Sequence, residues 1–211
     1  MALNPLIDSR DMRFVLFEML EADRLSRYDA FSLFDRDTYE STLDLAEKMA
    51  VERVYPANSI ADKTGARYDP ATKGVAVPAE FKTAMAYFNE AGFTGLASDP
   101  AWGGTGMPEV MYRAVMEYFF AASISFTMNV SLLVGAANLV KKFATEEMKQ
   151  LYLAKMISGQ WGGTMCLTEP EAGSDVGALK TRAVQQKDGT YLITGQKIFI
   201  SAGENDLYEN I

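Results

Sequence analysis

The stretch that decides the fold spans residues 164–175 and reads Thr-Met-Cys-Leu-Thr-Glu-Pro-Glu-Ala-Gly-Ser-Asp. A short apolar run ends at Leu167 and Thr168, and Pro170 then removes a backbone donor and stops any regular element. The small residues that follow form a loop whose backbone N–H groups can approach a bound group closely. A second stretch, residues 195–201, reads Gly-Gln-Lys-Ile-Phe-Ile-Ser. We therefore expect the chemistry of this chain to gather at these two stretches.

The character of the sequence changes from helical to β near Gly162. After that residue, Thr, Val, Ile and aromatic side chains lie between turn signals, which is typical of strands. Asp188-Gly189 is a strong cue for a two-residue hairpin turn, and residues 190–194 and 197–201 read as strands. A β domain is therefore predicted to begin after about residue 160. Its sheet would normally need more strands than these to cover a core.

Upstream of this change, apolar residues recur at helical spacing between helix start and stop signals. Residues 37–40 read as a capping box, and Pro56 ends the helix that follows. Pro78 opens the next helix, and Gly92 is its predicted C-terminal cap. Further helices are predicted after Pro108, over about residues 124–142 and over residues 145–157, with a short helix within residues 10–20 and a surface loop over residues 55–74.

Composition limits the class of protein. The 211 residues are 48% hydrophobic, so a sizeable core can be buried. The formal net charge of −8 disfavours a nucleic-acid partner, which needs a basic face. The sequence has no histidine, which excludes Ser-His and Cys-His nucleophile pairs and His-based metal sites. Its single cysteine, Cys166, fits a reducing compartment and reads as a small, buried strand residue rather than a nucleophile.

One stretch is long enough to be weighed as a membrane span, because no charged residue occurs from Tyr118 to Val140. Seven polar or glycine residues interrupt this stretch and offset much of the gain from its Leu and Val residues. A helix buried inside a bundle is the better interpretation. The N-terminus has no signal-peptide profile, so we expect a soluble, cytoplasmic protein without a membrane span.

The stretches 164–175 and 195–201 together resemble the middle-domain signature of acyl-CoA dehydrogenases, flavoenzymes that desaturate fatty acyl thioesters. Residues 99–107, Asp-Pro-Ala-Trp-Gly-Gly-Thr-Gly-Met, resemble the family's turn between two helices of the N-terminal domain. Residues 4–11, running on to Phe17-Glu18, are similar to an extension of one bacterial subgroup that includes the 3-methylmercaptopropionyl-CoA dehydrogenases. The likeness covers essentially the whole chain, which corresponds to about the first third of such a protein.

The resemblance implies an α+β fold in three parts. Residues 1–36 are an N-terminal extension, residues 37–160 an α-helical bundle domain, and residues 161–211 the beginning of a β-barrel-like middle domain. The family's C-terminal helical domain is absent, so the chain is interpreted as the truncated N-terminal portion of a longer enzyme. The implied reaction is the FAD-dependent oxidation of an acyl-CoA thioester to the trans-2-enoyl-CoA. The implied partners are acyl-CoA, an electron-transfer flavoprotein or similar acceptor, and further copies in a homo-oligomer.

The same resemblance assigns site residues. Thr168 matches a position that hydrogen-bonds the flavin ring edge, and Gly173 and Ser174 match positions near FAD and the pantetheine arm of the substrate. Phe199 stands where the family commonly has Trp, and Ser201 where it has Thr, so an aromatic surface and a hydroxyl are kept. The implied cofactor-binding set is Met165, Leu167, Thr168, Gly173, Ser174, Phe199, Ile200 and Ser201. The implied substrate contacts are Ser174, Met128, Ser131 and Gly135, of which the last three fit ordinary core packing equally well.

No residue of this chain matches the family's catalytic base, a Glu of the C-terminal domain, which is expected to lie beyond Ile211. Glu169, Glu171 and Asp175 are therefore not interpreted as catalytic acids, no metal site is expected, and the 211-residue piece alone is expected to be inactive.

Two other readings stay open. One is a catalytically silent α-domain module that binds a partner protein or an acyl chain, and the other is a flavin monooxygenase or DNA-repair-linked relative of the same architecture. The acidic charge disfavours DNA, and the intact signature string favours dehydrogenation.

Overall fold

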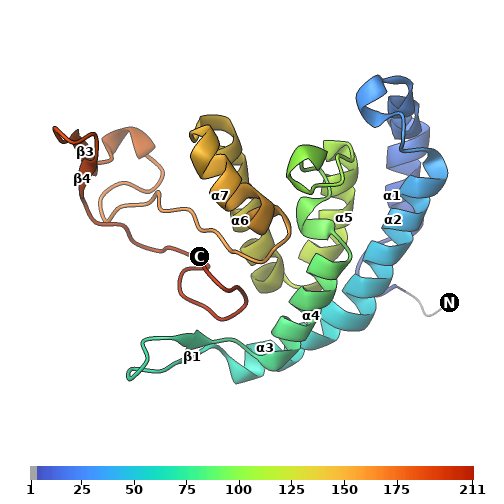
Figure 1. The fold of residues 1–211 in the computed structure, drawn as a ribbon. Coiled ribbons are helices and arrows are strands. Elements are labelled where there is room, and N and C mark those ends of the chain that lie inside the picture. The colour runs from blue at the N-terminus through green and yellow to red at the C-terminus, as the bar shows by residue number, and fades with distance from the viewer. Residues whose placement is uncertain (1–3) are drawn as a thin grey trace.

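The computed structural model of the chain describes residues 4–211 and places a helical bundle beside a small, open β segment (Figure 1). The helices are α1 (Ser9–Arg13), α2 (Arg36–Met49), α3 (Tyr55–Thr64), α4 (Ala79–Glu90), α5 (Glu109–Ala122), α6 (Ile124–Phe143) and α7 (Glu146–Ile157). Strands β1 (Arg67–Tyr68) and β2 (Val75–Ala76) form one antiparallel hairpin, and β3 (Arg182–Gln185) and β4 (Tyr191–Thr194) form another. The predicted order, a helical part followed by the start of a β part, is confirmed.

A cluster of aromatic rings holds the centre of the bundle together. Phe88 of α4 packs edge-on against Phe119 of α5, with ring centroids 4.7 Å apart, and against Phe126 of α6, at 5.8 Å. Phe93, in the connection after α4, lies 5.4 Å from the rings of both Phe88 and Phe119. Each such pair contributes about 0.5–1.5 kcal/mol beyond the burial of its area. Because three helices share this cluster, α6 is held rigidly and can support the segments that cross it.

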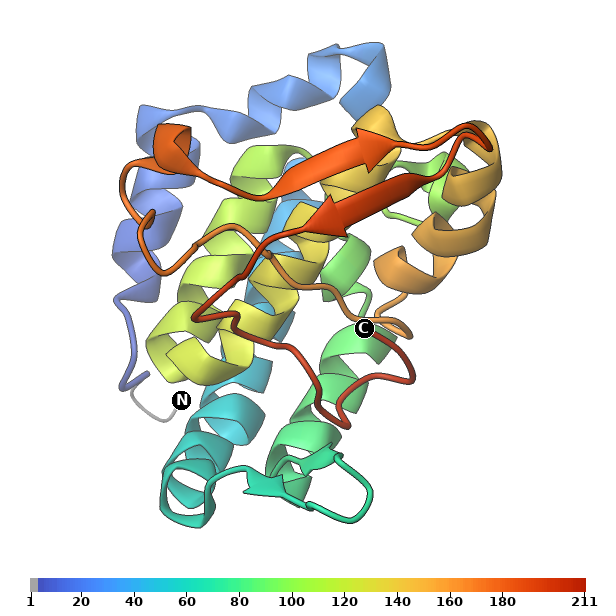
Figure 2. The same ribbon diagram turned by 90° about the vertical axis from the view of Figure 1, so that its left-hand side faces the viewer.

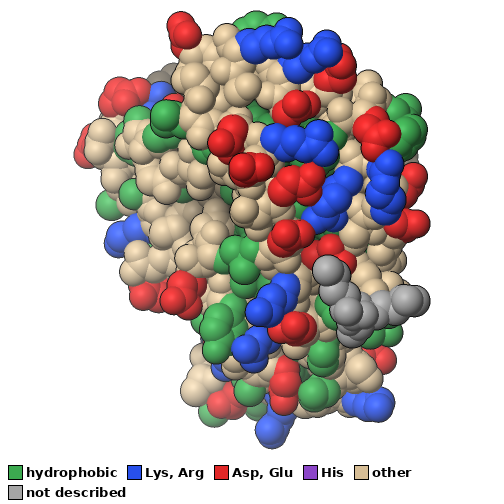
Figure 3. Space-filling model, turned by 90° about the vertical axis from the view of Figure 1, so that its right-hand side faces the viewer, with side chains coloured by type: hydrophobic (Ala, Val, Ile, Leu, Met, Phe, Trp, Pro, Cys, Tyr) green, Lys and Arg blue, Asp and Glu red, His purple; other side chains and the backbone are tan. Residues whose placement is uncertain are grey.

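The N-terminal residues pack along α2 through one half-buried arginine. Arg13 donates to Glu40 at 2.8 Å and to Asp44 at 2.6 Å, both on α2. Met12 and Phe17 are buried under the same contact. Figure 3 shows acidic and basic side chains interleaved over this face of the molecule. The extension is thus fixed to the bundle by apolar burial and by paired charges.

The predicted helix end at Pro56 and the predicted surface loop over residues 55–74 are wrong. α2 continues through a π-helical turn, Ala50–Val54, directly into α3, and Pro56 occupies the first turn of α3. A proline is tolerated at a first turn, and the wider π turn before it relieves the clash with the preceding carbonyl. Buried Ala57 and Ala61 then hold α3 against the core. The remainder of the predicted loop forms the hairpin of β1 and β2.

Three predicted turns and caps have mixed outcomes. The capping box at residues 37–40 is displaced, because Asp35 is the cap of α2 and its carboxylate accepts from Thr38 N at 2.8 Å. Gly92 follows α4 with a left-handed φ of +76°, so the predicted glycine cap is confirmed. The predicted hairpin turn is in the right place, but it is longer than two residues. Gln186 N donates to Thr190 O at 2.8 Å around it.

The predicted strand over residues 197–201 is also wrong. Pairing in the second hairpin ends where Thr194 faces Arg182, and Phe199 has a left-handed φ of +59° that no strand residue adopts. The chain then turns back to the bundle (Figure 2), where Gly162 N donates to Asn210 O at 2.7 Å. Residues 197–201 leave the strand conformation because they bond to an upstream loop instead of a neighbouring strand.

Among the described residues one helix, α6, is long and apolar enough to cross a bilayer by length and composition. It packs between α5 and α7, and its Phe126, Val130 and Leu133 side chains are buried in the bundle. About a quarter of its apolar window is buried in this way (28%), and Ile124, Leu139 and Phe143 remain exposed.

Candidate functional site

The two signature segments, residues 164–175 and 195–201, run side by side on the side of the bundle that carries α6 and α7, and they extend away from it toward β3 and β4 (Figures 1 and 2). Ile198 N donates to Thr168 O at 3.0 Å. The Thr164 hydroxyl donates to Ser201 O. The structure therefore joins the two stretches that the sequence analysis selected, although residues 176–194 separate them in the chain.

The carboxylate of Glu169 lies between the two segments and is only 6% exposed. Its Oε2 accepts from Lys180 N at 2.6 Å, and its Oε1 accepts from Thr181 N at 3.0 Å. Lys197 Nζ donates to the same Oε1 at 2.9 Å and to Leu167 O at 2.9 Å. A buried charge is stable when it is both paired and hydrogen-bonded, and this carboxylate meets both conditions.

These donors set the charge of Glu169. The Thr181 side chain, the Lys180 amide and the Lys197 ammonium hold the pKa of Glu169 at about 2, below its ordinary value. The Thr181 hydroxyl is buried close to the backbone of Gly195 and makes no hydrogen bond of normal geometry. A carboxylate with so low a pKa is a weak base at neutral pH and carries no proton to donate. Glu169 is therefore suited to holding structure rather than to proton transfer.

A tight turn follows the buried carboxylate. Glu169 N donates to Ala172 O at 3.0 Å, and Ala172 N donates to Glu169 O at 3.1 Å. Ala172 is buried, whereas Glu171 at the corner points to solvent and pairs with Lys180 Nζ. The turn brings Gly173 back to Thr168, since a Cβ on Gly173 would lie 3.8 Å from Thr168 Cγ2.

The predicted cofactor-binding residues all lie on these two adjoining segments and are largely uncovered; we call this set the signature surface. Phe199 is 84% exposed, and Met165 and Leu167 are each 42% exposed. The other members are the half-buried Thr168 and Ile200 and the exposed Gly173, Ser174 and Ser201. The two segments therefore carry both exposed apolar side chains and hydroxyl groups, the kinds of group that a flat ligand with apolar faces and a polar edge requires.

The predicted substrate residues lie on one face of α6, at the three- and four-residue spacing of Met128, Ser131 and Gly135. Met128 is 38% exposed, and a Cβ on Gly135 would meet nothing within 4 Å, so this face is open. Gly163 links α6 to the signature segments, because its Cβ would lie 2.7 Å from Ala136 Cβ. Within residues 4–211, no hydrogen bond joins these three α6 residues to the signature surface.

The last described residue, Ile211, lies beside the bundle and not in the signature surface. It is 39% exposed and follows Asn210, whose carbonyl accepts from Gly162 N at 2.7 Å. Of the three carboxylates within the first signature stretch, Glu169 is engaged by its donors, Glu171 pairs with Lys180 in solvent, and Asp175 is exposed. The expectation that the family's base lies beyond Ile211 stays a prediction.

The prediction for one residue, Cys166, is wrong, and the structure shows two supporting residues that the sequence analysis did not identify. Cys166 is exposed, not buried in a strand as predicted, because residues 164–168 form an irregular segment. The support that Lys197 and Thr181 give to the site was not predicted. Opposite charges in the two signature stretches could have indicated the Lys197–Glu169 pair, whereas Thr181 carries no such signal. Among residues 4–211 there is no group of three or more His, Cys, Asp or Glu that could hold a metal ion.

Comparison with known families covers most of the chain. The family model described as acyl-CoA dehydrogenase, N-terminal domain, matches residues 37–160, and the model described as acyl-CoA dehydrogenase, middle domain, matches residues 164–208. This chain belongs to the acyl-CoA dehydrogenase family. The predicted family is confirmed.

Individual acyl-CoA dehydrogenases extend the match to the N-terminal residues. The chain is 36% identical to the 3-methylmercaptopropionyl-CoA dehydrogenase of Ruegeria pomeroyi, over 96% of the chain and 34% of that protein, which confirms the predicted likeness to that subgroup. It is 38% identical to a butyryl-CoA dehydrogenase of Syntrophomonas wolfei, over 99% of the chain and 34% of that protein. The chain therefore spans about a third of the length of these curated relatives.

Solved structures of acyl-CoA dehydrogenases share the fold. The butyryl-CoA dehydrogenase of Megasphaera elsdenii matches 77% of this chain and 40% of its own, with a TM-score of 0.64 and 27% identity. The Bacillus anthracis acyl-CoA dehydrogenase complexed with FAD matches 79% of this chain and 27% of its own, with a TM-score of 0.63 and 25% identity. A structure reported for the electron transferring flavoprotein of Acidaminococcus fermentans matches 79% of this chain and 40% of its own, with a TM-score of 0.64 and 28% identity.

Proposed function

We propose that the protein containing this chain is an FAD-dependent acyl-CoA dehydrogenase that oxidises an acyl-CoA thioester to the trans-2-enoyl-CoA. The observation that carries the proposal is the signature surface, formed where the Ile198–Thr168 hydrogen bond joins the two family stretches. Family relatives named for their action on butyryl-CoA and 3-methylmercaptopropionyl-CoA support a thioester substrate, and the FAD-bound structure of a relative supports the cofactor.

The chemistry of the signature surface fits a flavin ring. Phe199 and Met165 offer apolar contact to a ring face. Thr168 and Ser201 offer hydroxyl groups, which can donate or accept at the polar ring edge. Gly173 allows a close backbone approach from the same turn. Bound FAD would supply the hydride-accepting chemistry that no side chain has, and these residues would bind and orient it.

The open face of α6 is the proposed place for the acyl chain. Gly135 leaves space there, and the flexible Met128 side chain can adapt to different chains. Ser174 is proposed to meet the pantetheine arm. No carboxylate of this chain is proposed as the base: none matches the family's base, and Glu169, which is enclosed between the signature segments, is engaged by its donors with a pKa at about 2. The base is proposed to lie in the region of the full-length protein that corresponds to the remaining two thirds of its relatives.

An electron-transfer flavoprotein is the proposed electron acceptor, supported by the likeness to the Acidaminococcus fermentans structure. A homo-oligomeric state is proposed because β3 and β4 form a two-stranded sheet with exposed side chains, and the outer edge of each strand is open to pairing. A cytoplasmic location stays a prediction from the sequence.

The test uses the full-length natural protein and measures flavin binding and flavin reduction. The purified protein should be yellow, and acyl-CoA substrates should bleach the flavin absorbance and drive dye reduction. The double variant Thr168→Ala, Phe199→Ala should weaken FAD binding about tenfold or more, since it removes a hydrogen bond and an aromatic contact. The matched control is Glu171→Gln on the exposed corner of the same loop, which should bind FAD as the wild type does.

The alternatives give different readouts in the same experiment. A silent binding module would bind acyl-CoA without bleaching a flavin. A flavin monooxygenase would consume oxygen with reduced flavin and form a hydroxylated product. Unchanged FAD affinity in the double variant would contradict the proposed site, and failure of every acyl-CoA tested to reduce the flavin would contradict the proposed reaction.

A further inference from the structure

The pair formed by Glu169 and Lys197 is the most enclosed ion pair of the described residues, with side chains 6% and 23% exposed. We propose that it is a positioning pair: it fixes Thr168 and Phe199 relative to each other and so shapes the flavin site without touching the flavin. This inference rests on the FAD site proposed above. It gives a role to Glu169 and Lys197, two charged residues that take no part in the proposed reaction.

The carboxylate of Glu169 connects its own segment to two others, at residues 180–181 and at Lys197. Glu169 receives donors from Lys180 N at 2.6 Å, from Thr181 N at 3.0 Å and from Lys197 Nζ at 2.9 Å. Lys197 Nζ also donates to Leu167 O at 2.9 Å, so one ammonium group binds both the carboxylate and the backbone just before Thr168. The two flavin-facing residues are thus close neighbours of the pair in sequence.

Besides the ion pair, two hydrogen bonds connect the segments of the two flavin-facing residues: Ile198 N donates to Thr168 O, and the Thr164 hydroxyl donates to Ser201 O. Residues 164–168 and 195–201 belong to no helix or strand. Phe199 is 84% exposed and has a left-handed φ of +59°, a conformation that persists in a non-glycine residue only where the surroundings hold it. Its neighbours Lys197 and Ile198 are held, by the Glu169 carboxylate and by Thr168 O. The direction in which the Phe199 ring points therefore depends on these anchors.

The chain provides a matched control two residues away. Glu171 pairs with Lys180 Nζ, but these side chains are 71% and 73% exposed. An exposed pair is screened by water, whereas removing one partner of an enclosed pair leaves an uncompensated charge. Loss of Glu171 should therefore leave the site unchanged, while loss of Glu169 should not.

The experiment compares Glu169→Gln, Lys197→Met, Lys197→Arg and Glu171→Gln in the full-length protein, with FAD as the probe. The first two should bind FAD about tenfold more weakly or worse, and Glu171→Gln within about twofold of wild type. Lys197→Arg should recover part of the affinity because it keeps the charge. A second readout is hydrogen exchange in the flavin-free protein. The Ile198 amide should exchange faster in Glu169→Gln and Lys197→Met, while the amides of α4 to α6 stay protected.

Each result decides the proposal. Wild-type affinity in Glu169→Gln and Lys197→Met would overturn the positioning role and leave the proposed function intact. Loss of protection throughout the helices would show a general structural role and would also overturn it. If both of those variants fail to fold, Lys197→Arg decides: FAD binding weaker than in Glu171→Gln, with the helices still protected, supports the positioning role, and binding equal to that of Glu171→Gln overturns it. A wild-type protein that binds no FAD would refute the proposed function, and the positioning role with it.

Discussion

At the scale of single residues, the carboxylate of Glu169 should make the free energy of unfolding of the chain depend on pH in the acid range. Its donors hold its pKa at about 2 in the folded chain, against an ordinary value of 4.5. A lowered pKa means that the ionised form favours folding, so this contribution is complete above about pH 4.5 and is lost as the pH falls from there toward 2. The difference in free energy of unfolding between wild type and Glu169→Gln should therefore be constant near neutrality and shrink below pH 4.5.

Urea unfolding of both chains between pH 7 and pH 3 measures this difference. Comparing two chains that differ at one residue cancels the contributions of the other carboxylates. Glu171→Gln is the reference substitution, because its carboxylate stands in solvent. A difference that stays the same from pH 5 to pH 3 would contradict the prediction.

Residue types in the signature stretches could be predicted to matter, but their environments could not. Cys166 was predicted to be buried because it follows an apolar run, yet the segment is irregular and the thiol is exposed. The conformation of Phe199 depends on contacts made by Lys197 about 30 residues back in the chain, at Leu167 and Glu169. Such long-range hydrogen bonds leave no periodic signal in a sequence.

At the scale of elements, Asp206 connects the C-terminal loop to the start of α4. Its carboxylate accepts from Val77 N at 2.8 Å and pairs with Lys82. Asp206→Ala should lower the free energy of unfolding by about 1 kcal/mol, since a charged acceptor is lost at a partly exposed position. It should also speed hydrogen exchange at Gly162, whose amide donates to Asn210 O in the same loop.

The control for this substitution is Glu109→Ala, which removes an exposed ion pair with Arg113 on α5. Its effect should stay within about 0.5 kcal/mol, because exposed pairs within a helix contribute little. Unchanged exchange at Gly162 in Asp206→Ala would show that the loop is held by Tyr208 and its other contacts alone.

Elements with strong local signals were predictable. α4 to α7 lie where apolar spacing and Pro or Gly signals placed them, because those signals act within a few residues. The helix α3 could not be predicted in this way, because a proline inside a helical pattern normally marks the end of the helix. Here a π turn before Pro56 allows the helix to continue, and burial of Ala57 and Ala61 stabilises it. That outcome depends on the tertiary core and not on local preference.

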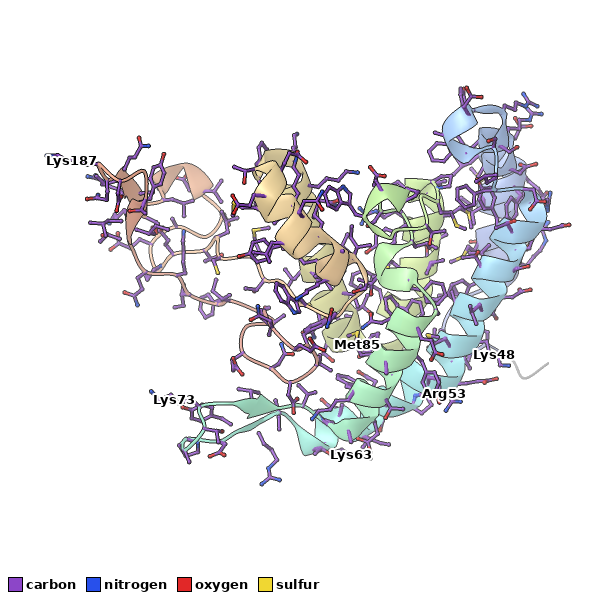
Figure 4. All side chains as sticks on the ribbon, in the orientation of Figure 1. Lys48, Arg53, Lys63, Lys73, Met85 and Lys187 are labelled. Atoms are coloured by element: carbon purple, nitrogen blue, oxygen red, sulfur yellow. The ribbon has the colours of Figure 1, made fainter. Side chains whose placement is uncertain are left out.

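At the scale of the whole molecule, the bundle and the β segment differ in how much they bury. The aromatic cluster around Phe88 is enclosed by α4, α5 and α6. By contrast, every residue of β3 and β4 is exposed, including Ile193 at 74%. Figure 4 shows the tip of their hairpin, at Lys187, pointing away from the bundle. The sequence could indicate which stretch carries the site, but not that its surface would stand open.

This contrast predicts two levels of stability in the 211-residue chain. A two-stranded hairpin is marginally stable by itself, so amides of residues 182–194 should exchange much faster than those of α4 to α6. Exposed strand edges also favour pairing between copies, so protection of the hairpin should rise with protein concentration. Hydrogen exchange at several concentrations, with the oligomeric state measured in parallel, tests both statements. Hairpin protection equal to that of the helices in a monomeric sample would contradict them, because it would mean that the β segment is stabilised by contacts within one chain.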